Sequence, residues 1–124
     1  HEIGDNYVLK SNQTVYLAPG AYVKGQFVSD GQENITIMGQ GIISGEEYPA
    51  RSHNHMISFR NCNNVLIEGV TIINAPRYCV SLSGTNQICR NLKMMGWWFS
   101  TDGIGIGSNS LIEDCFFKVN DDAI

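Results

Sequence analysis

The chain has 124 residues, of which 43% are hydrophobic and 16% are charged, and its formal net charge is −4. This composition is too apolar for a disordered chain and too interrupted for a membrane span, so it predicts one soluble globular unit. The acidic balance, without any run of Lys or Arg, argues against nucleic acid and against a membrane surface as partners. A neutral ligand fits this charge best.

The first predicted elements surround a Pro-Gly turn. The segment that begins at Thr14, "TVYLAPGAYVKGQF", contains two short apolar runs on either side of Pro19 and Gly20. This pattern is typical of two short strands joined by a tight turn. The next run begins at Asn34, "NITIMGQGII", and a polar insert at residues 46–54 follows it.

A repeat then dominates the rest of the chain. The segments "NVLIEGVTII", "NQICRNLKMM" and "NSLIEDCFFK" begin at Asn64, Asn86 and Asn109, which are 22 and 23 residues apart. The run at Asn34 has the same shape one step earlier. A repeat of this length indicates a stacked architecture, and the chain holds about five such units.

Each unit contains short alternating runs that meet at a Gly, Asn or Asp. Alternation indicates strands with one buried face, and the hinge residues tolerate left-handed backbone angles. Strands of about 3 to 5 residues that recur at this period predict an all-β fold, a right-handed parallel β-helix in which each turn stacks on the last. The predicted inward column is Ile67, Cys89 and Ile112, with Val70, Leu92 and Cys115 beside it.

The four cysteines, Cys62, Cys79, Cys89 and Cys115, have neither the spacing of a zinc site nor the density of a disulfide scaffold. Buried or unpaired thiols that fill the core are therefore the expected state. A bridge between Cys79 and Cys89 is the alternative.

Three acids stand out near the end of the chain. Asp102 precedes Asp121 by 19 residues, slightly less than one repeat, and Asp122 follows directly. Because adjacent turns are ~4.8 Å apart, the three carboxylates are expected to converge. Such crowding raises the pKa of one acid and so provides the acid and base that glycosidic hydrolysis needs. A solvated turn or a cation site is the alternative reading of the same acids.

The stretches "VYLAPGAYVKGQF", "GQGIISGEEY" and "FSTDGIGIGSNSLIEDCFFKVNDDAI" together resemble the dextranase and isopullulanase family of glycoside hydrolases, family 49. The similarity extends from about Thr14 to the end of the chain. It implies a right-handed parallel β-helix as the catalytic domain. It also implies that Asp121 is the general acid, that Asp102 and Asp122 activate water, and that an α-glucan, most directly dextran, is cleaved with inversion.

Two other functions compete with this reading. Polygalacturonases share the β-helix and the three acids, but their matching segment usually has Asn where this chain has Ser100. Lys118, the only cation close to the acids in sequence, keeps a polyanionic substrate open. A non-catalytic β-helix that binds carbohydrate or serves as a stalk is the third possibility, since fold does not imply function.

Four further residues are candidates for substrate binding. Trp97 and Trp98 lie just before the acidic segment, and an exposed aromatic ring there would stack on the apolar face of a sugar. Tyr48 lies in the polar insert and would wall a cleft, and Lys118 lies close to the acids. No cofactor and no metal site is predicted.

Residues 1–124 are expected to be a single partial β-helix domain, truncated at both ends, from a larger catalytic domain. His1 stands where an initiator Met is expected, and the final turn has no polar cap. The isolated piece is therefore expected to be a poor enzyme. A polysaccharide substrate implies an extracellular or periplasmic location, although the chain carries no signal peptide, and the oligomeric state is left open.

Overall fold

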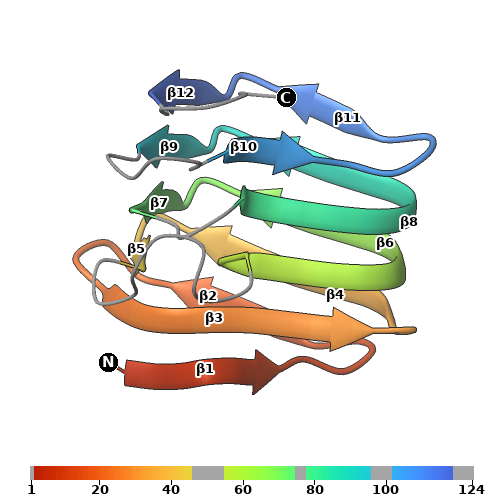
Figure 1. The fold of residues 1–124 in the computed structure, drawn as a ribbon, viewed down its shortest axis with the longest axis horizontal. Helices are drawn as coiled ribbons and strands as arrows, with labels where there is room; N and C mark the ends of the chain where they lie inside the picture. Colours follow the sequence, from red (N-terminus) through yellow and green to blue (C-terminus); the bar gives the residue numbers. More distant parts are fainter. Residues whose placement is uncertain (1, 46–54, 75–77, 96–101, 119–124) are drawn as a thin grey trace.

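The computed structural model describes residues 2–45, 55–74, 78–95 and 102–118. Within these ranges the chain forms strands and turns and no helix (Figure 1). The strands are β1 (Glu2–Val8), β2 (Thr14–Leu17), β3 (Tyr22–Asp30), β4 (Glu33–Gly39), β5 (Ile42–Ser44), β6 (Ile57–Glu68), β7 (Thr71–Ile73), β8 (Tyr78–Arg90), β9 (Lys93–Met95), β10 (Asp102–Gly105), β11 (Leu111–Glu113) and β12 (Phe116–Lys118).

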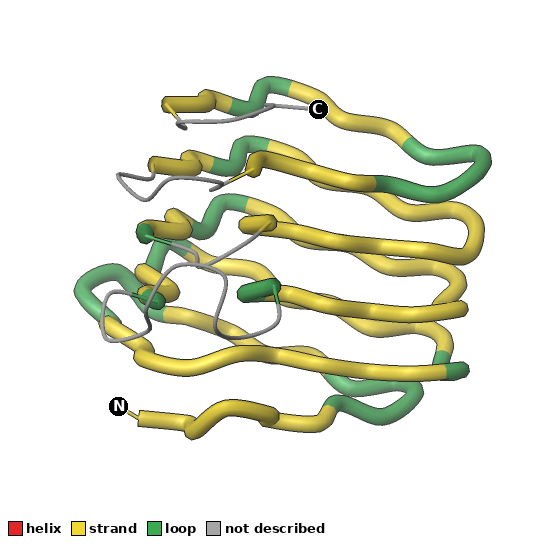
Figure 2. Tube along the Cα trace, in the orientation of Figure 1, coloured by secondary structure: helices red, strands yellow, loops and turns green. Residues whose placement is uncertain are grey.

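All of these strands pair in parallel, and the pairs stack in three columns (Figure 2). The first column contains β1, β3, the start of β6, the start of β8, and β10. The second contains β2, β4, the ends of β6 and β8, and β11. The third contains β5, β7, β9 and β12. This coil of five successive turns confirms the parallel β-helix.

The corner between the first and second columns is built by asparagines. Asn12, Asn34, Asn64, Asn86 and Asn109 all have positive φ angles, between 50° and 66°. Asn34 Nδ2 donates to Asn12 Oδ1 at 3.0 Å, and Asn64 Nδ2 donates to Asn34 Oδ1 at 3.3 Å. Asparagine tolerates the left-handed region because its short side chain hydrogen-bonds locally. The hinges that the sequence predicts lie at the next corner, where Gly69, Asn91 and Asp114 have φ angles of 84°, 54° and 53°, and they are confirmed there.

Two strands are much longer than the expected 3 to 5 residues. β6 has 12 residues and β8 has 13, because hydrogen bonding to the neighbouring turn continues through the corner. The chain bends at Asn61, with φ 53°, and at Gly84, with φ 119°, without leaving the sheet. The first-column parts of β6 and β8 are therefore strands that the sequence analysis, with its strands of about 3 to 5 residues, did not predict.

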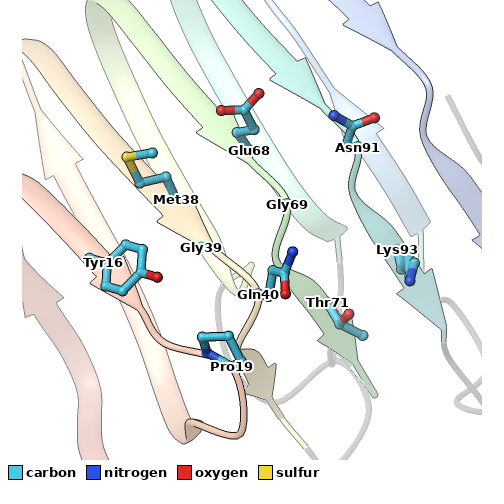
Figure 3. A pocket seen from close by; sticks show the side chains of 10 residues that line it. All are labelled: Tyr16, Pro19, Met38, Gly39, Gln40, Glu68, Gly69, Thr71, Asn91 and Lys93. Atoms are coloured by element: carbon cyan, nitrogen blue, oxygen red, sulfur yellow. The ribbon is translucent and has the colours of Figure 1, made fainter.

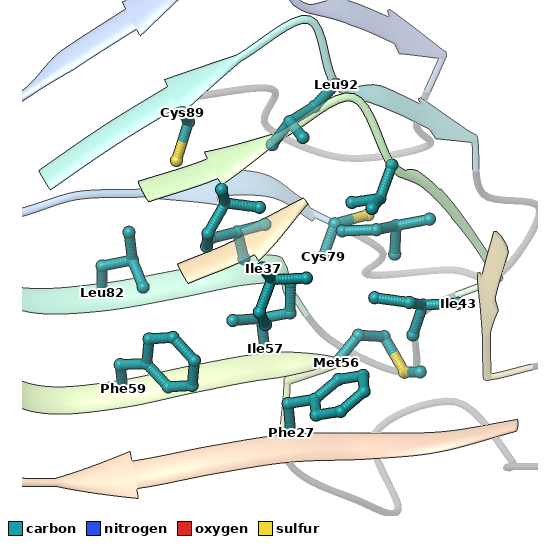
Figure 4. Close-up of a cluster of buried hydrophobic side chains, with 14 of the residues drawn as sticks. Phe27, Ile37, Ile43, Met56, Ile57, Phe59, Cys79, Leu82, Cys89 and Leu92 are labelled. Atoms are coloured by element: carbon teal, nitrogen blue, oxygen red, sulfur yellow. The ribbon is translucent and has the colours of Figure 1, made fainter. Parts of the chain in front are cut away.

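The interior is a dry stack of aliphatic, aromatic and sulfur-containing side chains (Figure 4). Cys89 is in register with Ile67 on one side and Ile112 on the other, as predicted, and Ile37 extends the column by one turn. Full burial of one such aliphatic side chain contributes about 1.5–3 kcal/mol. Of the other predicted core residues, Val70 and Leu92 are fully buried and Cys115 packs at the margin.

One buried polar side chain ties three turns together. The Gln87 amide nitrogen donates to the backbone oxygens of Cys62 and Ser83, at 3.0 and 2.8 Å. The Gln87 amide oxygen accepts from the backbone nitrogen of Gly107 at 2.9 Å. Because every bond compensates the loss of water on burial, Gln87 holds the segment after β10 in place against β8.

All four cysteines lie in the described part of the chain, and no disulfide joins any of them. The alternative of a Cys79–Cys89 bridge is therefore wrong. Burial, together with the neighbouring Cys115, raises the pKa of Cys89 to about 12. This thiol stays neutral at physiological pH and is a poor nucleophile, so it acts as a core residue.

Candidate functional site

Asp102 is the first residue of β10. Its backbone is in register with Tyr78, the first residue of β8, in the parallel pair that joins these strands. The acid therefore lies where the chain arrives in the first column from the third column of the previous turn (Figure 1). Its place in the coil follows from the backbone register, because residues in register on adjacent strands are ~4.8 Å apart.

Lys118 is placed by the pairing of β12 with β9. It is the last residue of β12 and is in register with Met95, the last residue of β9. Lys118 therefore stands where the chain leaves the third column, and Asp102 stands where it enters the first. The remaining predicted site residues, Asp121, Asp122, Trp97, Trp98 and Tyr48, lie outside the described residues.

The order of the described strands shows what these positions share. Tyr48 falls between β5 and β6, Trp97 and Trp98 fall between β9 and β10, and Asp121 and Asp122 follow β12. In each case the preceding strand belongs to the third column, and in the first two cases the next strand belongs to the first column. In chain order, the candidates thus follow third-column strands of three different turns.

The register also adds residues that the sequence analysis missed. Ile57, Val80 and Ile104 form one row of the first column, because both isoleucines pair with Val80. His55, Tyr78 and Asp102 each lie two residues before a member of this row. His55 is partly buried and participates in polar or electrostatic contacts. The signal was present in the spacing, because 23 and 24 residues separate these three positions, close to one repeat.

Three charged side chains on the described outer face form a ladder across adjacent turns. Arg90 is in register with Glu68 and Glu113 on the two adjacent turns. Its Nη1 lies 3.5 Å from Glu68 Oε2, and its Nε lies 3.4 Å from Glu113 Oε2. The three side chains are about one third to one half exposed, so each pair contributes at most about 1 kcal/mol. With two carboxylates and one guanidinium, this ladder keeps one net negative charge.

Within the described ranges, no three His, Cys, Asp or Glu side chains gather in a way that could hold a metal ion. The same ranges contain no helix of the length and hydrophobicity needed to cross a membrane.

A groove of about 780 Å³ lies at a different corner, between the second and third columns (Figure 3). Its floor is the bend at Gly39 and Gly69, whose φ angles are 122° and 84°. The groove crosses four turns of the coil. Its lining residues are Tyr16, Pro19, Met38, Gly39, Gln40, Glu68, Gly69, Thr71, Asn91 and Lys93.

Known proteins of similar sequence are enzymes that act on polysaccharides. The chain is 32% identical to a dextranase of Arthrobacter globiformis over 100% of its length, and 35% identical to a dextranase of Talaromyces minioluteus over 99%. It is also 32% identical, over 74% of its length, to a probable polygalacturonase of Arabidopsis thaliana. The chain spans about a quarter of each relative: 24%, 24% and 22% of their lengths.

A solved structure supports the fold. The crystal structure of a putative glycosyl hydrolase from Parabacteroides merdae superimposes with a TM-score of 0.60, covering 98% of this chain and 80% of that one. At 18% identity this likeness concerns the fold alone.

The family comparison agrees with the resemblance seen in the sequence. The two dextranase matches confirm the similarity to dextranases, although the matching family model is that of family 28. That model, described as glycosyl hydrolases family 28, matches residues 13–124. The chain therefore belongs to the glycosyl hydrolases of family 28.

Proposed function

We propose that the protein is a glycoside hydrolase that cleaves an α-glucan, most directly dextran. The observation that carries this proposal is the similarity to two dextranases over essentially the whole chain. The formal charge of −4, in a sequence without any run of Lys or Arg, also suits a neutral polymer better than a polyanion. A polymeric substrate of this kind places the proposed activity outside the cell or in the periplasm.

The proposed catalytic groups are the three acids. Asp121 acts as general acid and protonates the glycosidic oxygen, which releases the leaving sugar with its new hydroxyl group. Asp102 and Asp122 accept a proton from a water molecule, whose oxygen attacks the anomeric carbon from the opposite face. Two backbone positions support this grouping. Asp102 begins β10, where the chain enters the first column. Lys118, three residues before Asp121, ends β12 in the third column.

Inversion requires a particular spacing of the acids. A separation of about 6.5–9.5 Å leaves room for water between the general acid and the general base, whereas about 5–5.5 Å would favour a covalent intermediate. The proposal places Asp121 about one turn after Asp102 in chain order, and any offset along the strands adds to the ~4.8 Å between turns. The inverting mechanism is therefore the one proposed here.

The proposed substrate-binding residues extend this edge along the coil axis. Trp97 and Trp98 precede Asp102 in the connection from β9, and Tyr48 occupies the corresponding connection from β5. Lys118 ends β12 on the same side. His55 and Tyr78 join the proposal because the register aligns them with Asp102. A glucan that runs along the axis would contact one turn after another.

A polygalacturonase is the second candidate. The match to a probable polygalacturonase favours it, and Lys118 is a cation that could pair with a uronate. Ser100 in place of the usual Asn counts against it.

Release of reducing sugar from dextran, pullulan and polygalacturonate by the full-length protein that carries this chain tests the proposal. We expect dextran to be cleaved fastest, because the dextranase similarity covers the whole chain. Faster release from polygalacturonate would replace the proposed substrate by pectin. Failure to release sugar from any of the three would favour a non-catalytic binding role.

A further inference from the structure

The groove between the second and third columns is flanked by two outward-facing rows of side chains. On the second column, Tyr16 is in register with Met38, and Met38 with Glu68. On the third column, Thr71 is in register with Lys93, and Lys93 with Phe116. The groove thus runs parallel to the coil axis, with one set of side chains contributed by each turn (Figure 3).

Exposed aromatic rings stand near both ends of this groove. Tyr16 is 62% exposed at one end, and Phe116, one turn beyond Lys93, is 57% exposed at the other. The Tyr16 ring lines the groove itself, so it offers apolar area that a ligand in the groove would cover. The flat C–H face of a pyranose is a suitable partner for such a ring, since aromatic side chains combine a large apolar area with defined geometry.

The walls between the rings carry groups that can bond hydroxyls. Gln40 and Asn91 offer amide donors and acceptors, Thr71 offers a hydroxyl, and Lys93 offers an ammonium group. The carboxylate of Glu68 is balanced by Arg90 at 3.5 Å. A groove with both charge signs and several neutral polar groups suits an uncharged, hydroxyl-rich polymer better than a polyanion.

The period of the groove fits such a polymer. Positions in register recur once per turn, ~4.8 Å apart, and one sugar unit has a comparable length. A glucan chain lying along the axis would therefore meet a new pair of side chains at each turn, one from each row. Gly39 and Gly69 let the turns stack closely at the floor, because a Cβ at either position would clash with the backbone of the neighbouring turn.

We infer that this groove is a second, non-catalytic binding site for a glucan chain. It lies at a different corner from Asp102, which stands where the third column leads into the first. A chain held here would keep the polymer near the acids and raise its effective concentration there. The choice of a glucan rests on the proposed function, whereas the groove itself rests on its own geometry.

Retention of the protein on immobilised dextran, pullulan and polygalacturonate, measured in the cold, tests this site. We expect Tyr16→Ala to weaken dextran binding about fivefold to tenfold, the loss expected for one aromatic stacking partner. Tyr16→Phe keeps the ring and should bind almost as the parent does. Lys93→Gln removes the ammonium group that lines the groove. Its control is Lys10→Gln, which removes the same charge at an exposed position outside the groove.

Turnover of a short isomalto-oligosaccharide distinguishes this site from the catalytic one. Tyr16→Ala should leave that turnover unchanged, because a short substrate does not reach both corners. If Tyr16→Ala and Lys93→Gln bind all three polysaccharides as tightly as the parent, the second site is wrong. If the variants lose affinity for pullulan or polygalacturonate but not for dextran, the groove is a binding site and the proposed substrate is wrong.

Discussion

Replacing Asp121 by Asn is expected to lower the rate of dextran hydrolysis about a hundredfold to ten-thousandfold while leaving the fold intact. An amide has almost the same shape as the carboxylic acid but cannot protonate the leaving oxygen, and loss of a general acid has an effect of this size. Because Asn still occupies the site, affinity for dextran should change little. Initial rates and binding of the purified variant, measured beside the parent, give both quantities.

The matched control is Asp114→Asn. Asp114 is an exposed acid at the bend between β11 and β12, with φ 53°, and Asn tolerates the same backbone angle. This control should retain full activity. Near-normal turnover by Asp121→Asn would remove Asp121 from the proposed mechanism, and an equal loss in both variants would point to charge rather than to proton transfer.

Substitution of Gly69 by Ala is expected to destabilise the coil far more than the same substitution at Gly20. The two glycines have almost equal φ angles, 84° and 87°, so the left-handed conformation costs alanine about 1–2 kcal/mol at either position. A Cβ at Gly20 would meet nothing within 4 Å. A Cβ at Gly69 would lie 2.2 Å from the backbone oxygen of Gly39, so the stacked turns must separate locally.

This clash should add about 1–3 kcal/mol, the usual cost of forcing extra atoms into a packed interior. Unfolding in urea, followed by circular dichroism for the parent and both variants, measures the difference in free energy. Equal losses of stability in Gly69→Ala and Gly20→Ala would mean that the turns are not stacked as closely at this corner as the structure shows.

Much of the coil could be predicted because its repeat follows from the conformational and burial preferences of single residues. Asparagines at regular spacing revealed the repeat, and alternation around Ile67 and Cys89 identified the inward face. Both signals depend only on backbone preference and on burial, which are properties of single positions. Register followed from them because a shift by one residue would expose the buried column.

The first column was harder to predict. β1 (Glu2–Val8) contains Glu, Gly, Asp and Asn, which do not read as a strand, and pairing with β3 is what holds it. In β6 and β8 the strand continues through a bend at Asn61 or Gly84, which in sequence resembles a break. Such strands are defined by hydrogen bonds to the next turn, which no local pattern contains.

The candidate site, too, could be predicted only in part from the sequence. The spacing of the acids indicates that they stand about one turn apart, and this stays a prediction because Asp121 and Asp122 lie outside the described residues. His55 and Tyr78 were missed because their alignment with Asp102 depends on the pairing of β6, β8 and β10. The axial groove was missed for a related reason, since Tyr16, Glu68 and Lys93 come from three different turns.

The central claim is that this family 28 chain cleaves an α-glucan by direct attack of a water activated by Asp102 and Asp122. Proton NMR of the first product released from dextran, recorded before the new end equilibrates, tests it most directly. Inversion at an α-linked sugar predicts that the new reducing end appears first as the β-anomer. An α-anomer as the first product would contradict the claim, because it would require a covalent intermediate on the enzyme.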